Sequence, residues 1–138
     1  MRILAVDHGT KRMGIAISDE MKMIAQPVGF VAAEPFTDFA VWLKEIIAQK
    51  QIELILVGMP RNMDGTYGPA AIKVQEFVTA LEQVVVVPIK TWDERLTSAQ
   101  ANRFLVEAGV RRRDRKGKVD HTAAAILLQS YLDSSAGL

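Results

Sequence analysis

The stretch RILAVDHGTKRMGIAIS, residues 2–18, contains two short apolar runs separated by a polar turn. The first run, residues 2–7, is stopped by Gly9, and the second covers residues 13–18. Runs of this length bounded by turn residues are typical of strands. We therefore expect two strands that lie close enough to pair as a hairpin.

Asp7 follows Ile3 and Ala5 at a period of two, so it points to the same face of the predicted sheet as they do. An aspartate at the end of an apolar strand is costly unless it is paired, hydrogen-bonded or metal-bound. A simpler role is also open, because Asp7 could cap the turn at Gly9-Thr10.

The pattern continues with a third strand over residues 24–32, where Pro27 favours an edge position or a bulge. Apolar residues then recur at helical spacing. They predict a helix with the stripe Phe36, Phe39, Ala40, Leu43 and Ile47. A strand at 53–57 is expected next, followed by a helix from Pro69. The apolar contacts of that helix would come from Ile72, Phe77, Ala80 and Leu81. The last expected elements are a strand at 84–89 running on to Trp92, a helix to about Ala108, and a final helix opened by Asp120.

Three sequential strands followed by alternating helices and strands predict an α/β fold, a mixed sheet flanked by helices. The sequence has no repeat and no Pro/Ser-rich linker, and its length of 138 residues suits one unit. We expect a single domain over residues 1–138.

Composition excludes several classes. With no cysteine, the chain has neither a disulfide framework nor a thiolate metal site. Its apolar runs are too short to span a bilayer, and Met1 leads directly into a strand without a signal-peptide layout. We expect a soluble cytoplasmic protein with no membrane partner.

The net charge of +1 hides a basic segment at residues 111–118. This segment has a local charge of +5, which leaves −4 for the rest of the chain. It indicates a local anion-binding surface, although a solvated charged loop is the plainer interpretation. Its cations are Arg111, Arg112, Arg113, Arg115, Lys116 and Lys118, against the single acid Asp114.

Two further acidic positions are informative. Asp93 and Glu94 come just past a predicted strand, and adjacent strand residues face opposite ways. Only one of them should point where Asp7 points, and periodicity leaves the choice open. The other one is expected to pair with Arg95 or to cap a turn.

Asp120 extends an apolar helical stripe formed by Ala124, Leu127, Leu128 and Tyr131, although it could also be a solvated N-cap. Carboxylates that converge cannot all stay ionised without compensation. Mg²⁺ is commonly held by such carboxylates together with substrate phosphate oxygens. The acids would then hold metal, and the basic segment a nucleic-acid backbone.

Four blocks, in order, resemble the signatures of the YqgF/RuvX family of bacterial ribonuclease H-like proteins. They are DHGTKRMG at 7–14, GMPRNMDGT at 58–66, DERLT at 93–97 and KGKVD at 116–120. The resemblance covers essentially the whole chain. It implies a ribonuclease H-like fold with a central five-stranded mixed sheet.

The same resemblance implies a catalytic Mg²⁺ or Mn²⁺ site formed by Asp7, Glu94 and Asp120; it is the family that favours Glu94 over Asp93. Lys11, Arg12, Arg95 and the cations of residues 111–118 would face phosphates. The implied activity is a metal-dependent endonuclease in pre-16S rRNA processing, with ribosomal precursor particles as partners. The alternatives are a Holliday junction resolvase on branched DNA and a non-catalytic RNA-binding assembly factor, as a monomer or a homodimer.

Nucleotide hydrolysis fits this chain less well. A D-x-G-T block also occurs in actin-like ATPases, but they need two lobes and this chain supplies one; residues 109–117 do not match a P-loop.

Asn62 and Thr66 could contact substrate or simply shape a turn. His8 and His121 could shuttle protons, although a lone histidine beside a turn is more often a satisfied surface group.

Overall fold

The structure, a computed structural model, describes residues 1–62, 64–94 and 123–134. It contains a five-stranded sheet in the order β3-β2-β1-β4-β5. The β1–β2 and β2–β3 pairs are antiparallel and the β1–β4 and β4–β5 pairs are parallel, so the predicted mixed sheet is confirmed. The elements are β1 (Arg2–Asp7), β2 (Arg12–Ser18), β3 (Ala25–Ala32), α1 (Phe36–Lys50), β4 (Ile52–Met59), α2 (Pro69–Glu82) and β5 (Ile89–Asp93), followed by a helix over 123–134.

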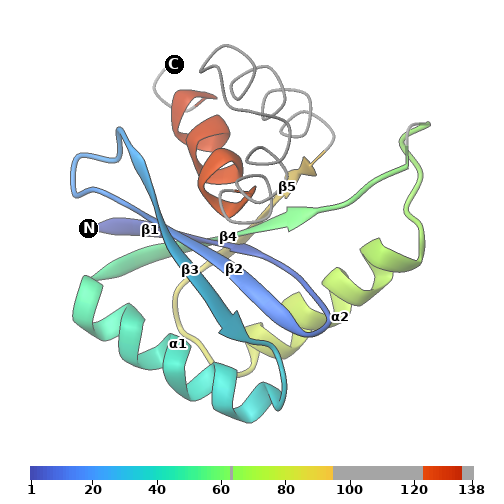
Figure 1. Ribbon diagram of the computed structural model, residues 1–138, viewed down its shortest axis with the longest axis horizontal. Coiled ribbons are helices and arrows are strands. Elements are labelled where there is room, and N and C mark those ends of the chain that lie inside the picture. The colour runs from blue at the N-terminus through green and yellow to red at the C-terminus, as the bar shows by residue number, and fades with distance from the viewer. Residues whose placement is uncertain (63, 95–122, 135–138) are drawn as a thin grey trace.

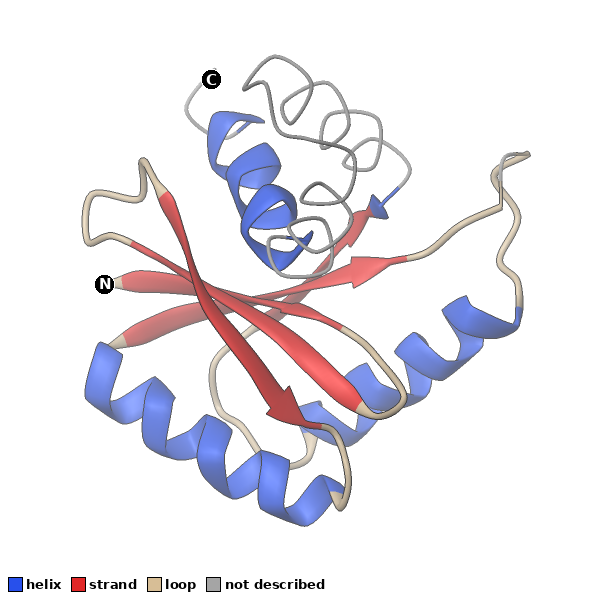
Figure 2. Cartoon of the chain, in the orientation of Figure 1, coloured by secondary structure: helices blue, strands red, loops and turns tan. Residues whose placement is uncertain are grey.

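Helices cover both faces of the sheet (Figures 1 and 2). Helices α1 and α2 lie against one face, and helix 123–134 lies against the other. Alternation along β1 supplies both cores: Leu4 and Val6 pack with α1 and α2, and Ile3 and Ala5 pack with helix 123–134. None of the helices that the structure describes is long and apolar enough to cross a membrane.

Helix α1 has the predicted buried stripe, with Phe39, Ala40 and Leu43 inside the core. In α2, Pro69 occupies the first turn as expected, where its missing N–H costs nothing. One predicted contact is wrong: the side chain of Ile72 is exposed. The buried stripe of α2 instead follows Ala71, Val74, Phe77 and Leu81, and Ile72 lies to the side of it.

The predicted strand at 84–89 is also displaced. The backbone N–H groups of Val84 and Val85 both donate to the carbonyl of Leu81, so these residues close the turn that follows α2. The ladder with β4 begins only at Ile89, opposite Ile55. The side chains of Val84, Val85 and Val87 pack on the core, whereas Val86 is fully exposed. The backbone of these valines is not paired with a strand, so tertiary position overrides their β-propensity.

Strand β3 lies at the edge of the sheet. Its pairing with β2 shifts register between Ile15 and Ala16, which face Gly29 and Pro27. Pro27 has no N–H for a ladder, so both parts of its prediction, the edge position and the bulge, are confirmed.

Candidate active site

Asp7 ends β1 at the edge of the sheet where the parallel strands β1, β4 and β5 all finish. Its neighbours on both sides are glycines. Gly14 of β2 is its direct partner, and Gly58 follows Val57, which pairs with Val6. The carboxylate of Asp7 therefore stands between two stretches of bare backbone.

Glu94 occupies the space above Gly58. A Cβ atom built on Gly58 would overlap Oε1 of Glu94 and lie 3.0 Å from its Cγ and Cδ. Two residues earlier, Trp92 packs edge-on against Tyr131 of helix 123–134, with ring centroids 5.2 Å apart. Glu94 thus lies on the face of the sheet that helix 123–134 covers, the face to which Asp7 points.

The carboxyl groups of Asp7 and Glu94 share a side-chain hydrogen bond. Burial, the charge of Asp7, this hydrogen bond and the charge of Asp93 together raise the pKa of Glu94 from 4.5 to about 7. Two carboxylates this close cannot both ionise cheaply, so the pair retains a proton or binds a cation. The structure therefore pairs Glu94 with Asp7, a choice that periodicity had left open.

Asp93 points elsewhere. Its Oδ2 lies 3.8 Å from Nη1 of Arg61. The predicted partner Arg95 lies outside the described residues. Arg61 also donates to the carbonyl of Gly65 and lies 4.7 Å over the ring of Tyr67. Arg61 was not among the predicted site residues, although its position just after β4 places it near the strand ends where the acids meet.

Hydrogen bonds among Asn62, Asp64, Gly65 and Thr66 hold the turn that follows β4. The N–H of Asn62 donates to the Thr66 carbonyl at 2.8 Å, and Nδ2 of Asn62 donates to Oγ1 of Thr66 at 3.0 Å. Oγ1 of Thr66 in turn donates to Oδ1 of Asp64 at 2.6 Å. Both polar side chains that were considered for substrate contact therefore have a structural role in this turn.

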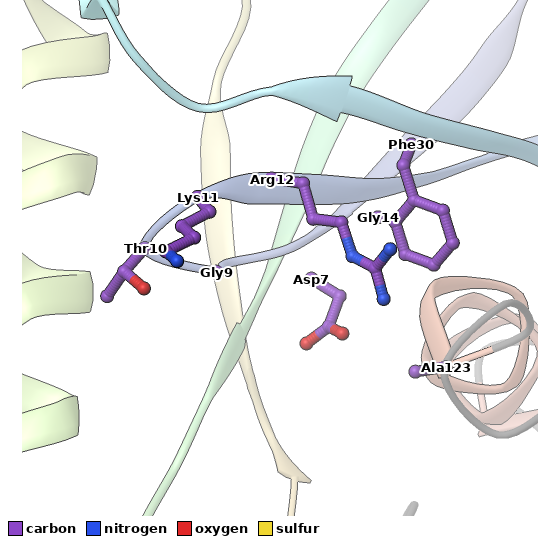
Figure 3. Close-up of a pocket in the computed structure, with 8 residues that line it drawn as sticks. All are labelled: Asp7, Gly9, Thr10, Lys11, Arg12, Gly14, Phe30 and Ala123. Atoms are coloured by element: carbon purple, nitrogen blue, oxygen red, sulfur yellow. The ribbon is translucent and has the colours of Figure 1, made fainter. Parts of the chain in front are cut away.

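A hollow of about 610 Å³ opens beside Asp7 (Figure 3). Two of the predicted phosphate-binding residues, Lys11 and Arg12, line it. The guanidinium carbon of Arg12 lies 4.1 Å from the centre of the Phe30 ring, a contact that the sequence did not reveal. The full lining is Asp7, Gly9, Thr10, Lys11, Arg12, Gly14, Phe30 and Ala123.

His8 takes the opposite direction from Asp7. Its ring packs against Phe77 of α2, with centroids 4.9 Å apart, among residues of the α1/α2 face. Burial lowers the pKa of His8. The charge of Asp7 acts in the opposite direction, and the charge of Lys73 lowers this pKa further. A neutral imidazole packed on Phe77 argues against a proton shuttle at the carboxyl pair.

The other predicted site residues lie outside the described ranges: Asp120, Arg95, His121 and the cations of 111–118. The stripe behind Asp120 is confirmed, because Ala124, Leu127 and Leu128 are buried on the face to which Asp7 points. Ala123, the first described residue of that helix, lines the same hollow as Asp7. Within the described residues, no cluster of three or more metal-binding side chains occurs.

The donor set that is described still suits a hard divalent cation. Asp7 and Glu94 supply carboxylate oxygens at one point, and burial together with the charge of Asp7 raises the pKa of Glu94, so its ionised form needs compensation. Oxygen ligands of this kind are the ones that Mg²⁺ takes in proteins.

A family model described as "RuvX: Holliday junction resolvase" matches residues 1–134. The chain belongs to the RuvX family. Among curated RuvX relatives, a Halothermothrix orenii protein named "Putative pre-16S rRNA nuclease" is 45% identical over 96% of this chain and 95% of its own length. A Syntrophomonas wolfei protein of the same name is 42% identical over 99% and 96%.

Two solved resolvase structures share the fold of this RuvX-family chain. T. thermophilus RuvC, solved with a Holliday junction substrate, matches with a TM-score of 0.60 at 16% identity, over 99% of this chain and 96% of that one. The fowlpox virus Holliday junction resolvase matches with a TM-score of 0.54 at 13% identity, over 97% and 99%. At these identities the likeness concerns the fold, and it confirms the predicted fold class.

Proposed function

We propose that this RuvX-family protein is a metal-dependent endonuclease that hydrolyses phosphodiester bonds, with precursor 16S rRNA as its substrate. The observation that carries the proposal is the carboxyl pair. Asp7 ends β1 and Glu94 directly follows β5, yet their side chains share one hydrogen bond. The names of the relatives, two of them 42–45% identical over nearly the full length, support the choice of RNA.

In this proposal, Asp7, Glu94 and Asp120 hold Mg²⁺ or Mn²⁺. Such an ion, when bound, would stabilise the negative charge that develops on the phosphate and on the attacking and leaving oxygens. With no cation bound, the raised pKa of Glu94 favours one proton retained by the pair. As ligands of a cation, both carboxylates would be ionised. The hollow that Asp7 lines, about 610 Å³ in volume, leaves room for a phosphate group beside the pair.

Cations beside the pair would hold that chain. Lys11 and Arg12 line the hollow next to Asp7, and we assign Arg95 and the basic segment 111–118 to the same backbone. Such contacts are electrostatic and largely independent of base sequence. Processing of precursor rRNA would set the cytoplasm as the compartment and ribosomal precursor particles as the partners, with the whole chain acting as one domain.

A second candidate is cleavage of branched DNA, which the description of the family model favours. A symmetric four-way junction calls for a two-fold dimer, whereas a precursor RNA can be cut by a monomer. A third candidate, a non-catalytic RNA-binding factor, gives no reason for two half-buried carboxyl groups to meet.

The test offers purified protein and Mn²⁺ a four-way DNA junction and a 16S precursor RNA side by side. We expect cleavage of the RNA, loss of that cleavage with EDTA, and loss in Asp7→Asn with binding retained. Asp38→Asn is the matched control, because Asp38 lies in the first turn of α1, which packs against the other face of the sheet. Cleavage of the junction alone would select the resolvase; full activity of Asp7→Asn would remove the carboxyl pair from the reaction.

A further inference from the structure

Phe30 of β3 has an aromatic ring at the rim of the hollow beside Asp7, with 37% of its surface exposed. Phe30, Gly14 and Asp7 form one row across three strands, because Phe30 pairs with Gly14 and Gly14 pairs with Asp7. Residues in such a row share a face of the sheet. The ring of Phe30 and the carboxylate of Asp7 therefore lie on either side of Gly14, which has no side chain.

Gly14 lies between the Phe30 ring and Asp7 on this face. A Cβ on Gly14 would lie 3.6 Å from Cε1 of Phe30 and 3.4 Å from Cβ of Asp7. The Phe30 ring thus lies partly over the glycine instead of standing away from the sheet. Its position beside Asp7 follows from strand register, since these side chains come from three different strands.

The guanidinium of Arg12 lies over this ring, 4.1 Å from its centre. Figure 3 shows the guanidinium between Phe30 and the carboxylate of Asp7, inside the hollow. A stacked guanidinium keeps its N–H groups free at the edge of its plane, where they can bind a phosphate in a bidentate manner. Lysine, a point charge on a flexible stem, has no such plane.

We propose that Phe30 is a positioning residue: it holds the guanidinium of Arg12 flat in the hollow, so that Arg12 binds the phosphate next to the one that is cleaved. The hollow, at about 610 Å³, is of a size that suits a bound nucleotide. This inference rests on the proposed nuclease function for the phosphate it names, but its central contact can be tested without cleavage.

The experiment is a double-mutant cycle on Phe30 and Arg12. Wild type, Phe30→Leu, Arg12→Lys and the double variant are titrated with a fluorescein-labelled single-stranded RNA in EDTA. Their kcat and KM are then measured with Mn²⁺ on precursor RNA. Phe30→Tyr is the conservative rescue. Val28→Ala is the matched control, because Val28 is an exposed apolar residue of the same strand that does not line the hollow.

We expect Phe30→Leu to weaken RNA binding and to raise KM by about 2- to 5-fold, the range of a cation–π contact at an exposed site. Phe30→Tyr should restore both values, and Val28→Ala should match wild type. The double variant should bind no more weakly than Arg12→Lys alone, because the ring then has no guanidinium to hold. A purely structural role of Phe30 would not produce this lack of additivity.

The inference is overturned if Phe30→Leu binds RNA as tightly as wild type. It is also overturned if the double variant loses the full sum of the affinities lost in Phe30→Leu and in Arg12→Lys. A melting temperature for each variant identifies losses that come from unfolding. The two proposals fail separately. Absence of Mn²⁺-dependent cleavage in the wild type would overturn the nuclease, while the binding cycle in EDTA would still decide the role of Phe30.

Discussion

The carboxylate of Glu94 lies over the bare backbone of Gly58, in the volume that a Cβ atom on Gly58 would fill. Gly58→Ala should therefore displace Glu94 from Asp7. We expect cleavage to fall about 10- to 100-fold, the range for residues that orient a metal ligand. The measurement is Mn²⁺-dependent cleavage alongside a thermal unfolding curve that confirms the fold.

Making Gly58→Ala in a Glu94→Ala variant separates the clash with Glu94 from any general effect of alanine at residue 58. In Glu94→Ala, the added methyl group meets no carboxylate, and Gly58→Ala should then be neutral or stabilise the fold by about 0.5–1 kcal/mol, as alanine does relative to glycine inside a strand. Equal destabilisation in both backgrounds would mean that Glu94 is not what requires glycine at this position.

The raised pKa of Glu94 predicts a specific dependence of stability on pH. Between about 4.5 and about 7 the folded protein keeps a proton that the unfolded chain has already released. Raising the pH through this window therefore favours unfolding. Urea titrations of the metal-free protein should show stability falling across the window, and the fall should be smaller in Glu94→Gln, which cannot titrate.

Divalent cations should reverse that loss. A bound cation favours the ionised carboxylates, so Mg²⁺ or Mn²⁺ at pH 8 should raise the melting temperature of the wild type and much less that of Asp7→Asn. Glu20→Gln, which removes an exposed carboxylate, serves as the control. A cation effect of equal size in Asp7→Asn would move the ion to another site.

The basic segment predicts a change in salt dependence. Neutralising Arg111, Arg112 and Arg113 together should weaken RNA binding and reduce the slope of log K against log salt by about 2 to 3. Fluorescence anisotropy over a series of salt concentrations measures this slope. An unchanged slope would mean that these arginines are merely solvated.

Core packing on the site face gives a stability prediction. Leu128 is fully buried between helix 123–134 and the sheet, so Leu128→Ala should cost about 2–5 kcal/mol. Ile72→Ala removes a similar side chain from an exposed position, and should change stability by no more than about 0.5 kcal/mol. Equilibrium urea unfolding of both variants makes the comparison. Similar costs would contradict the burial described for Leu128.

Periodicity in the sequence predicted most of this fold because each face of the sheet is buried by a different set of helices. Alternation in β1 correctly placed Asp7 on the face of Ile3 and Ala5. It failed at residues 84–88, where valines pack on the core without a neighbouring strand. Side-chain burial and strand pairing are separate requirements, and β-propensity reports only the first.

The candidate site was harder to predict, since its contacts join distant strands. Alternation along a strand shows that Asp93 and Glu94 face opposite sides of the sheet. It does not show which of them faces the side of Asp7 until one neighbouring side chain has been assigned to a face. Trp92 could have supplied that direction, because a tryptophan is expected to bury its ring, and Trp92 packs on Tyr131. The contacts of Arg61 with Asp93 and of Arg12 with Phe30 depend on strand order, which local spacing does not encode.

The pairing of the first strand of the sheet with an acid that follows its last strand has a consequence for synthesis. Asp7 leaves the ribosome early, but its partner can join it only after β5 has docked beside β4. A nascent or truncated chain that ends before residue 94 carries half of the pair. On the proposed function, an unfinished copy would therefore be unable to cleave precursor RNA.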